Sequence, residues 1–317
     1  MKFEDGEYGR KAVITSAWSP KMARDLVAHR VLELELNDGK GWRGNDLSFL
    51  RELSQLRAFT LIDYFGMPSE EPIHSLHELR KLEVLTYGKT AIRFSEFPEL
   101  EDCSLEWRPN CESLFSCTKL RKLCLNRYKK SNVDAFSNLI GLEWLGILNA
   151  PIANLLGLRG LARLKYLRLG GLRRLASLAG IERLELLEEL NLDTCCRIRS
   201  IAEVGSLLHL RKLHLSNCGE IESLRPLENL NTLEWVTSVE STNIVDGDIS
   251  PLLRQKGLSR VSYQNRRHYS HRREQFGAAY FGEELWKQIE NGCQAALDKR
   301  DGCQGTKTVF KSRLAER

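Results

Sequence analysis

Apolar residues recur in the short pattern LxxLxL across most of the chain, and two clear copies begin at Leu187 and Leu210. The last two apolar residues of each copy are two positions apart, so their side chains point to the same face of a short strand. After the strand, apolar residues recur every three positions, as at Ile198, Ile201 and Val204. This second spacing predicts a helical or 3-10 return segment.

The same register predicts further copies along the chain, spaced by 20 to 23 residues. Their middle residues are Phe59, Leu82, Cys103, Leu123, Leu145, Leu167, Leu190, Leu213 and Leu233. Two weaker copies lie at the ends of the array, at Leu34/Leu36 and at Leu258/Val261/Tyr263. The copy that contains Leu233 consists of Leu230, Leu233 and Trp235. Units this short cannot bury their own apolar edges, so they must stack into a solenoid.

Between Leu187 and Leu208 the chain follows LxxLxLxx(N/C), with isoleucines then spaced by three. This motif resembles that of the leucine-rich-repeat family, and the period is similar to the subclass of the internalins and the phosphatase-1 regulatory subunit. The resemblance covers roughly residues 30–265. It implies an α/β solenoid, a leucine-rich-repeat arc with a parallel concave sheet and short helical or 3-10 convex segments, capped at both ends. It also implies a binding role, since this fold carries few chemistries.

One position departs from the family pattern. Where the family carries an asparagine that caps backbone groups in the turn, we find other residues and therefore expect an irregular arc. These are Tyr64, Tyr87, Arg108, Tyr128, Ala150, Leu172, Cys195, Cys218 and Ser238. Cys195 and Cys218 are interpreted as structural substitutes in this column.

The chain ends are expected to cap the array. Residues 1–36 form the N-terminal cap and first strand, with a strand over 11–16, a helix from Pro20 to about His29 with Ser19 as its N-cap, and a strand over 31–36. Residues 37–265 form the repeat array. Residues 266–297 form a basic C-terminal cap with a possible helix over 283–297, and residues 298–317 form a polar tail that we expect to be mobile.

Composition and charge indicate the cellular location of the protein and the state of its cysteines. No run approaches the roughly 18–20 apolar residues of a membrane helix, and the start shows no apolar signal segment, so we expect a cytoplasmic protein and no membrane partner. The nine cysteines form no paired CxxC motifs, which favours reduced thiols. The net charge of +5 comes from the C-terminal end, because residues 254–273 alone carry +7.

The basic cluster has two interpretations. Arg266, Arg267, Arg272 and Arg273 could contact nucleic acid or an acidic partner, or they could be a charged cap that keeps the solenoid end soluble. The concave body of the repeat array is not basic, so we favour the cap and do not expect a nucleic-acid partner.

Motifs that carry catalysis or bind cofactors are missing from the sequence. It has no Walker or dinucleotide loop, no GxSxG and no HExxH. The pairs His74/His77 and His268/His271 have spacings compatible with a metal, but no cysteine or carboxylate set completes either site. We therefore expect a monomeric non-enzyme without cofactor or metal.

Strand residues beside the buried leucines point away from the core and can meet a protein partner on the concave face. Exposed aromatic residues and arginines are typical of binding hot spots. The candidate partner-binding residues are Trp107, Arg127, Trp144, Tyr166, Arg168, Asp193 and His214. The leading hypothesis is a cytoplasmic immunity protein that binds and neutralises a bacterial toxin. The alternatives are a regulatory scaffold for an enzyme such as a phosphatase, and a nucleic-acid-associated protein acting through residues 254–273.

Overall fold

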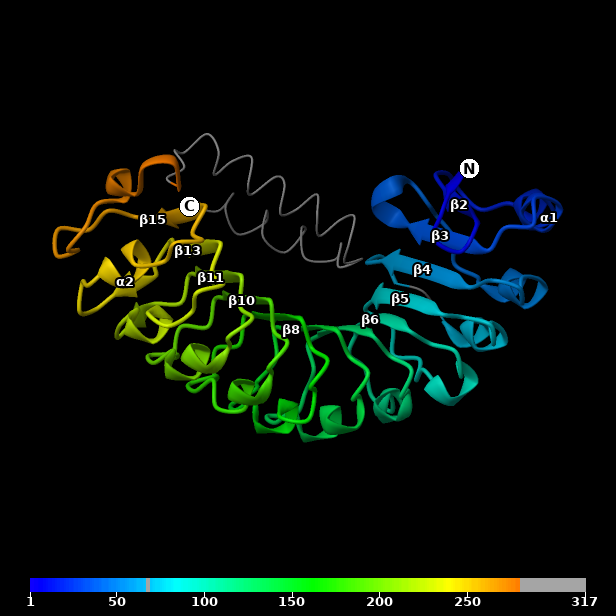
Figure 1. Ribbon diagram of the computed structural model, residues 1–317. Helices are drawn as coiled ribbons and strands as arrows, with labels where there is room; N and C mark the ends of the chain where they lie inside the picture. The colour runs from blue at the N-terminus through cyan, green and yellow to red at the C-terminus, as the bar shows by residue number, and fades with distance from the viewer. Residues whose placement is uncertain (67–68, 280–317) are drawn as a thin grey trace. The chain divides into compact units, whose positions relative to one another are not determined.

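The computed structural model describes residues 1–66 and 69–279. The helix expected over 283–297 and the tail 298–317 lie outside the described residues. By backbone contacts the described chain divides into two compact units, residues 1–124 and residues 125–279. Each unit is a stack of coils in which short strands lie side by side, with a return segment at the other edge of each coil (Figure 1).

Unit 1 begins with an antiparallel hairpin and continues as a parallel ladder in chain order. β1 (Lys2–Asp5) pairs antiparallel with β2 (Arg10–Ile14), and every later neighbour is parallel. The following strands are β3 (Glu33–Asn37), β4 (Ala58–Asp63), β5 (Lys81–Thr86) and β6 (Asp102–Glu106). The helix α1 (Pro20–Ala28) connects β2 to β3. The strand β7 (Lys122–Asn126) includes the boundary between the units.

Unit 2 repeats the same parallel ladder. Its strands are β8 (Trp144–Leu148), β9 (Tyr166–Gly170), β10 (Glu189–Asp193), β11 (Lys212–Ser216), β13 (Trp235–Val239) and β15 (Arg260–Tyr263). A separate two-stranded ladder joins β12 (Glu220–Ile221) to β14 (Asn243–Ile244). The four-residue helix α2 (Ser250–Leu253) precedes β15.

The return segments of the repeats are 3-10 helices, which settles the choice between helical types that the three-residue spacing left open. A 3-10 helix has three residues per turn, so apolar residues spaced by three stay on one side of it. They are Ser48–Glu52 (η2), Glu71–Ser75 (η3), Phe94–Glu96 (η4), Glu112–Ser116 (η5), Asp134–Asn138 (η6), Leu156–Leu158 (η7), Ile181–Arg183 (η8), Ala202–Ser206 (η9) and Arg225–Leu227 (η10). Two further 3-10 helices, Asp38–Lys40 (η1) and Arg273–Ala279 (η11), lie near the ends of the described chain.

The core of each unit is the column of strand leucines and return-segment residues. Leu190 and Leu213 are in register on β10 and β11, and both are fully buried. Ile198, Ile201 and Val204 of the intervening return segment are also buried. The repeat predicted from the sequence is therefore confirmed as the source of the core.

One predicted register is wrong. Strand pairing aligns Leu213 with Val236, and Leu215 with Ser238, so the buried positions of that copy are Val236 and Ser238 instead of Leu233 and Trp235. Leu233 is also buried, but it precedes the strand, so a period of about 20 placed the copy three residues too early. As a consequence, Trp235 lies on the opposite face of β13 from the core.

In the last coils, the turn position where the family carries an asparagine holds thiol and hydroxyl side chains that bond backbone groups. The Sγ–H of Cys195 donates to the carbonyl oxygens of Leu169 and Asp193, each at 3.6 Å, and Cys218 bonds the equivalent carbonyls one coil further on. Thr242 continues the column, since its Oγ1 accepts from the Cys218 N–H at 3.0 Å. Ser238, which the shifted register had put in this column, is a strand residue.

The strand and the helix expected near the N-terminus correspond to β2 and α1. Pro20 occupies the first turn of α1, but Ser19 makes no side-chain capping bond, and the hairpin strand β1 was not predicted. Six described cysteines are free thiols, whereas Cys124 is disulfide-bonded, so the expectation of reduced cysteines fails at that residue.

Candidate partner-binding face

The strands of unit 2 present one face away from the core, which we call the unit 2 strand face. Its side chains come from the first, third and fifth residues of each strand, because successive side chains of a strand point to opposite faces. Parallel pairing in register aligns them into rows across the strands. The first row is Trp144, Tyr166, Glu189, Lys212, Trp235 and Arg260.

Two of the predicted residues form the aromatic end of this row. Trp144 of β8 is directly opposite Tyr166 of β9, and both side chains are half-buried. Arg168 lies two residues beyond Tyr166 on the same face and is also half-buried. Neighbouring strands are about 4.8 Å apart, so these three side chains form one continuous surface.

The other end of the row is linked by charge and ring contacts. Lys212 pairs with Glu189 at 3.2 Å, and its ammonium lies 6.0 Å from the centre of the Trp235 ring. The guanidinium of Arg260 lies 4.9 Å from the same ring centre. Trp235 is thus a face residue between two cations. The sequence reasoning missed it because of the register error, although a constant spacing of 23 residues after Leu213 would have found it.

His214 stands in the second row of the same face. Its ring meets Trp235 edge-on with 5.0 Å between centres, and its Nδ1 is 3.0 Å from Oγ1 of Thr237. Burial lowers the pKa of His214 to about 4, with the nearby Lys212 acting in the same direction and Glu189 opposing it. At neutral pH the imidazole is therefore uncharged and serves as a fixed polar group.

Asp193 closes β10 and belongs to the third row. Its carboxylate accepts a hydrogen bond of 2.8 Å from the hydroxyl of Thr194, the next residue in the turn. The structure therefore brings five predicted residues onto the unit 2 strand face: Trp144, Tyr166, Arg168, Asp193 and His214.

The remaining two predicted residues stand in turns. Trp107 follows the last residue of β6 in unit 1, is buried, and packs against Phe115 with 5.8 Å between ring centres. Arg127 follows β7, is exposed, and has a left-handed backbone with φ of 60°. In both cases the predicted strand extended one residue beyond the end of the strand in the structure.

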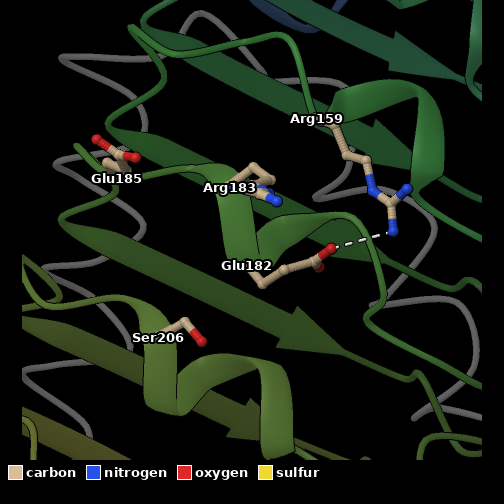
Figure 2. A pocket seen from close by; sticks show the side chains of 5 residues that line it. All are labelled: Arg159, Glu182, Arg183, Glu185 and Ser206. Atoms are coloured by element: carbon tan, nitrogen blue, oxygen red, sulfur yellow. Dashed lines mark hydrogen bonds and ion pairs between the residues drawn. The ribbon is translucent and has the colours of Figure 1, made fainter.

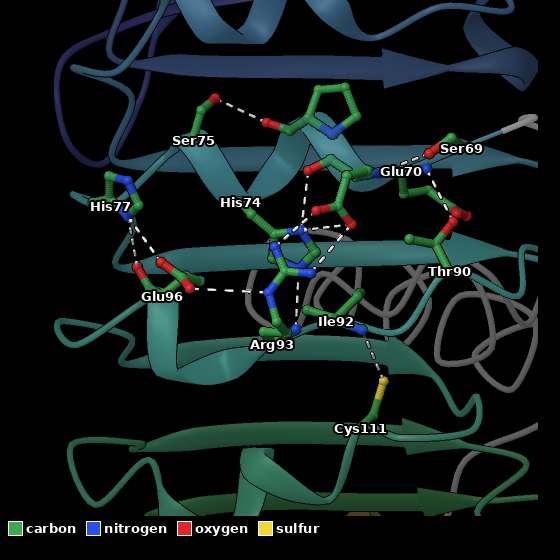
Figure 3. A network of polar contacts seen from close by, with 12 residues as sticks. Ser69, Glu70, His74, Ser75, His77, Thr90, Ile92, Arg93, Glu96 and Cys111 are labelled. Atoms are coloured by element: carbon green, nitrogen blue, oxygen red, sulfur yellow. Dashed lines mark hydrogen bonds and ion pairs between the residues drawn. The ribbon is translucent and has the colours of Figure 1, made fainter.

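The histidine pairs that the sequence raised as metal candidates bond to the protein itself. His74 is buried, and its Nε2 accepts the backbone N–H of Arg93 at 3.0 Å, while Nδ1 contacts the Glu71 carbonyl (Figure 3). His77 contacts the Glu96 carbonyl, and His268 contacts the Ile244 carbonyl. Across residues 1–66 and 69–279 no group of three or more His, Cys, Asp or Glu could hold a metal ion.

A shallow hollow of about 620 Å³ lies on the return segments of unit 2 (Figure 2). It is lined by Arg159, Glu182, Arg183, Glu185 and Ser206. Arg159 and Glu182, from successive coils, form an ion pair at 3.1 Å. Acidic and basic side chains both line the hollow, and Arg159 and Glu182 already pair with each other. The lining therefore favours neither an anionic nor a cationic ligand.

Part of the basic C-terminal cluster bonds to the last coils. Arg266 donates to the carbonyl oxygens of Thr242 at 3.1 Å and Glu240 at 3.4 Å. The Tyr269 hydroxyl accepts the backbone N–H of Ile244 at 2.9 Å. These bonds satisfy backbone groups at the end of the β12–β14 ladder.

Comparison with known structures agrees on the fold. An internalin (InlF) from Listeria monocytogenes is similar with a TM-score of 0.61 and 20% identity, over 80% of this chain and 74% of that one. A TDR receptor gives a TM-score of 0.56 at 16% identity, over 79% and 46% of the two chains. The functional domain of InlJ from Listeria monocytogenes, described as including a cysteine ladder, gives 0.52 at 17% identity, over 73% and 49%. The chain therefore has the leucine-rich-repeat fold.

No protein-family model and no curated protein matches the chain. Within the part of the chain that the structure describes, no helix is long and apolar enough to cross a membrane.

Proposed function

We propose that this protein is a binding module that holds a protein partner on the unit 2 strand face and catalyses no reaction. The observation that carries the proposal is the pairing of Trp144 with Tyr166 in register, half-buried and beside Arg168. Aromatic side chains supply large contact areas at low entropic cost, and such residues dominate the binding energy of protein interfaces. A receptor among the similar structures is in keeping with this role.

The size of the face favours a protein over a metabolite. Six strands in register span about 24 Å at the spacing of neighbouring strands. A surface of this width matches one side of a small protein interface, whereas small ligands bind in enclosed pockets. Asp193 and His214 would orient the partner through polar contacts around the aromatic residues.

The experiment begins with a photo-reactive amino acid at Tyr166, which cross-links the partner in cells and identifies it. The purified partner is then titrated against the Trp144→Ala and Tyr166→Ala variants. Each truncation should weaken binding by about 2 kcal/mol, which is roughly a thirtyfold rise in Kd, with unchanged thermal stability. The matched control is Phe65→Ala, which removes a highly exposed aromatic side chain in a turn of unit 1.

Unchanged affinity in both face variants would remove the unit 2 strand face from the proposal. The identity of the partner separates the finer roles. An immunity protein in the cytoplasm should abolish the activity of a toxin at a one-to-one ratio. A regulatory scaffold should instead bind an enzyme such as a phosphatase and leave its catalytic centre active.

A further inference from the structure

The strand β1 forms one edge of the strand ladder in unit 1. In the part of the chain that the structure describes, β1 pairs with β2 alone. Three of its four residues, Lys2, Glu4 and Asp5, are exposed. An exposed edge strand presents backbone N–H and C=O groups that pair readily with a strand of another chain. The open edge of β1 is therefore a candidate binding surface.

The pairing with β2 shows which backbone groups of β1 point to the open edge. Hydrogen-bonded and non-hydrogen-bonded residue pairs alternate in an antiparallel ladder. The N–H of Gly6 donates to the carbonyl of Gly9 at 2.8 Å, so these two residues are a hydrogen-bonded pair. The carbonyl of Arg10 instead accepts at 2.9 Å from the residue before β3, so it points away from Asp5. The N–H and C=O groups of Phe3 and Asp5 therefore point to the open edge.

The side chains of β1 are already held by the rest of unit 1. The half-buried ring of Phe3 stacks on His29 with 4.5 Å between ring centres, and the guanidinium of Arg10 lies 4.8 Å from the centre of the Phe3 ring. On the other face of the strand, Glu4 pairs with Lys11 of β2 at 3.1 Å. A strand that is held in this way loses little conformational entropy when another strand joins it.

The charges of β1 favour pairing with a second copy of itself. A two-fold axis keeps each face of the strand on its own side, so the axis of an antiparallel pair passes through a residue. An axis at Lys2 or at Glu4 places like charges opposite each other, which is destabilising. An axis at Phe3 places Lys2 of each copy opposite Glu4 of the other. In this register the outward backbone groups of the two Phe3 residues bond to each other.

We propose that β1 pairs with β1 of a second copy of this chain, antiparallel and centred on Phe3, to form a two-fold symmetric dimer. The four residues of β1 bury less area than a standard protein interface, so we expect a weak dimer with a Kd on the order of 100 µM. This dimer takes the place of the monomer expected from the sequence. The inference does not depend on the partner proposed for the unit 2 strand face.

Sedimentation equilibrium of the full chain, with any purification tag at its C-terminus, measures the dimer directly. Lys2→Glu places a glutamate opposite Glu4 of the other copy, and symmetry makes this happen twice, so Kd should rise at least about tenfold. The matched control is Lys21→Glu, which makes the same change of charge at an exposed residue of α1. The control should leave Kd unchanged within about twofold.

Mixing two variants that repel themselves tests the register. Glu4→Lys alone places a lysine opposite Lys2 of the other copy and should also weaken the dimer. An equimolar mixture of Lys2→Glu and Glu4→Lys chains places opposite charges at both positions. Heterodimers should then form with a Kd within about threefold of the value for the parent chain.

Amide hydrogen exchange gives a second readout. The amide of residue 4 bonds to β2, so it should be protected in the parent chain and in both variants at every protein concentration. The Phe3 and Asp5 amides should exchange more slowly as the concentration rises, in the parent chain and in the mixture but in neither variant alone. A parent chain that stays monomeric at about 500 µM would overturn the proposal. Equal Kd values for Lys2→Glu and Lys21→Glu, or a mixture that forms no heterodimers while the amide of residue 4 stays protected, would also overturn it.

Discussion

Truncation of Leu213 is the most direct test of how the repeats hold unit 2 together. Leu213 lies on β11 with Leu190 and Val236 beside it on the neighbouring strands, and its exposed fraction is 0%. Leu213→Ala removes three carbon atoms from a core that cannot fully collapse around the gap. The lost burial and the remaining cavity should together lower the free energy of unfolding by about 2–5 kcal/mol.

The matched control lies in the same repeat. Leu208 is five residues earlier in the chain and 62% exposed, so Leu208→Ala makes the same chemical change at the surface and should alter stability by less than about 0.5 kcal/mol. Urea unfolding followed by circular dichroism measures both variants. We expect Leu213→Ala to lower the melting temperature by roughly 5–15 °C. Equal effects of the two substitutions would refute the assignment of Leu213 to the core.

Two further predictions concern polar groups. The pKa of His214 in the folded protein is about 4, below the ordinary 6.5, so the unfolded chain binds more protons than the folded one between these pH values. The free energy of unfolding should therefore fall by up to about 3 kcal/mol as the pH drops from 6.5 to 4. Unfolding measured at several pH values should show a shallower loss in His214→Asn, and an equal slope would contradict this. In unit 1 the buried pair Arg108–Glu70, at 3.0 Å, also bonds the Thr86 hydroxyl. Arg108→Met or Glu70→Gln alone should cost about 3–5 kcal/mol in chemical denaturation, and the double variant should cost less than the sum.

The repeat was readable from the sequence because its physical cause is local. A spacing of two makes both leucines of a strand face the core, and a spacing of three does the same for a 3-10 segment. Leu190, Leu213 and Ile201 are buried for these reasons. Cys195 and Cys218 were likewise predicted as structural, since they occupy a fixed position after the strand.

The errors in strand register and strand ends arose where the spacing of apolar residues fits two alternative assignments. Leu233 and Val236 are both buried and both fit an LxxLxL reading, and only pairing with β11 shows that Val236 is the strand residue. This three-residue difference moved Trp235 from the core to the strand face. Trp107 and Arg127 were placed on strands for a related reason, because the end of a strand depends on where hydrogen bonding to its neighbour stops.

The sequence by itself determined the kind of fold, most members of the core and the basic character of the chain end. Each of these depends on residue type and on spacing within one repeat. Only the tertiary structure decided which polar residues share a surface and which are buried. The carboxyls of Glu35 and Glu83 are 48 positions apart in the sequence, yet strand pairing places both on the same face of the unit 1 strands, where both are buried. How deeply the outer face of a strand is buried depends on the segments that pack against it. The spacing of residues within one repeat gives no information about those segments.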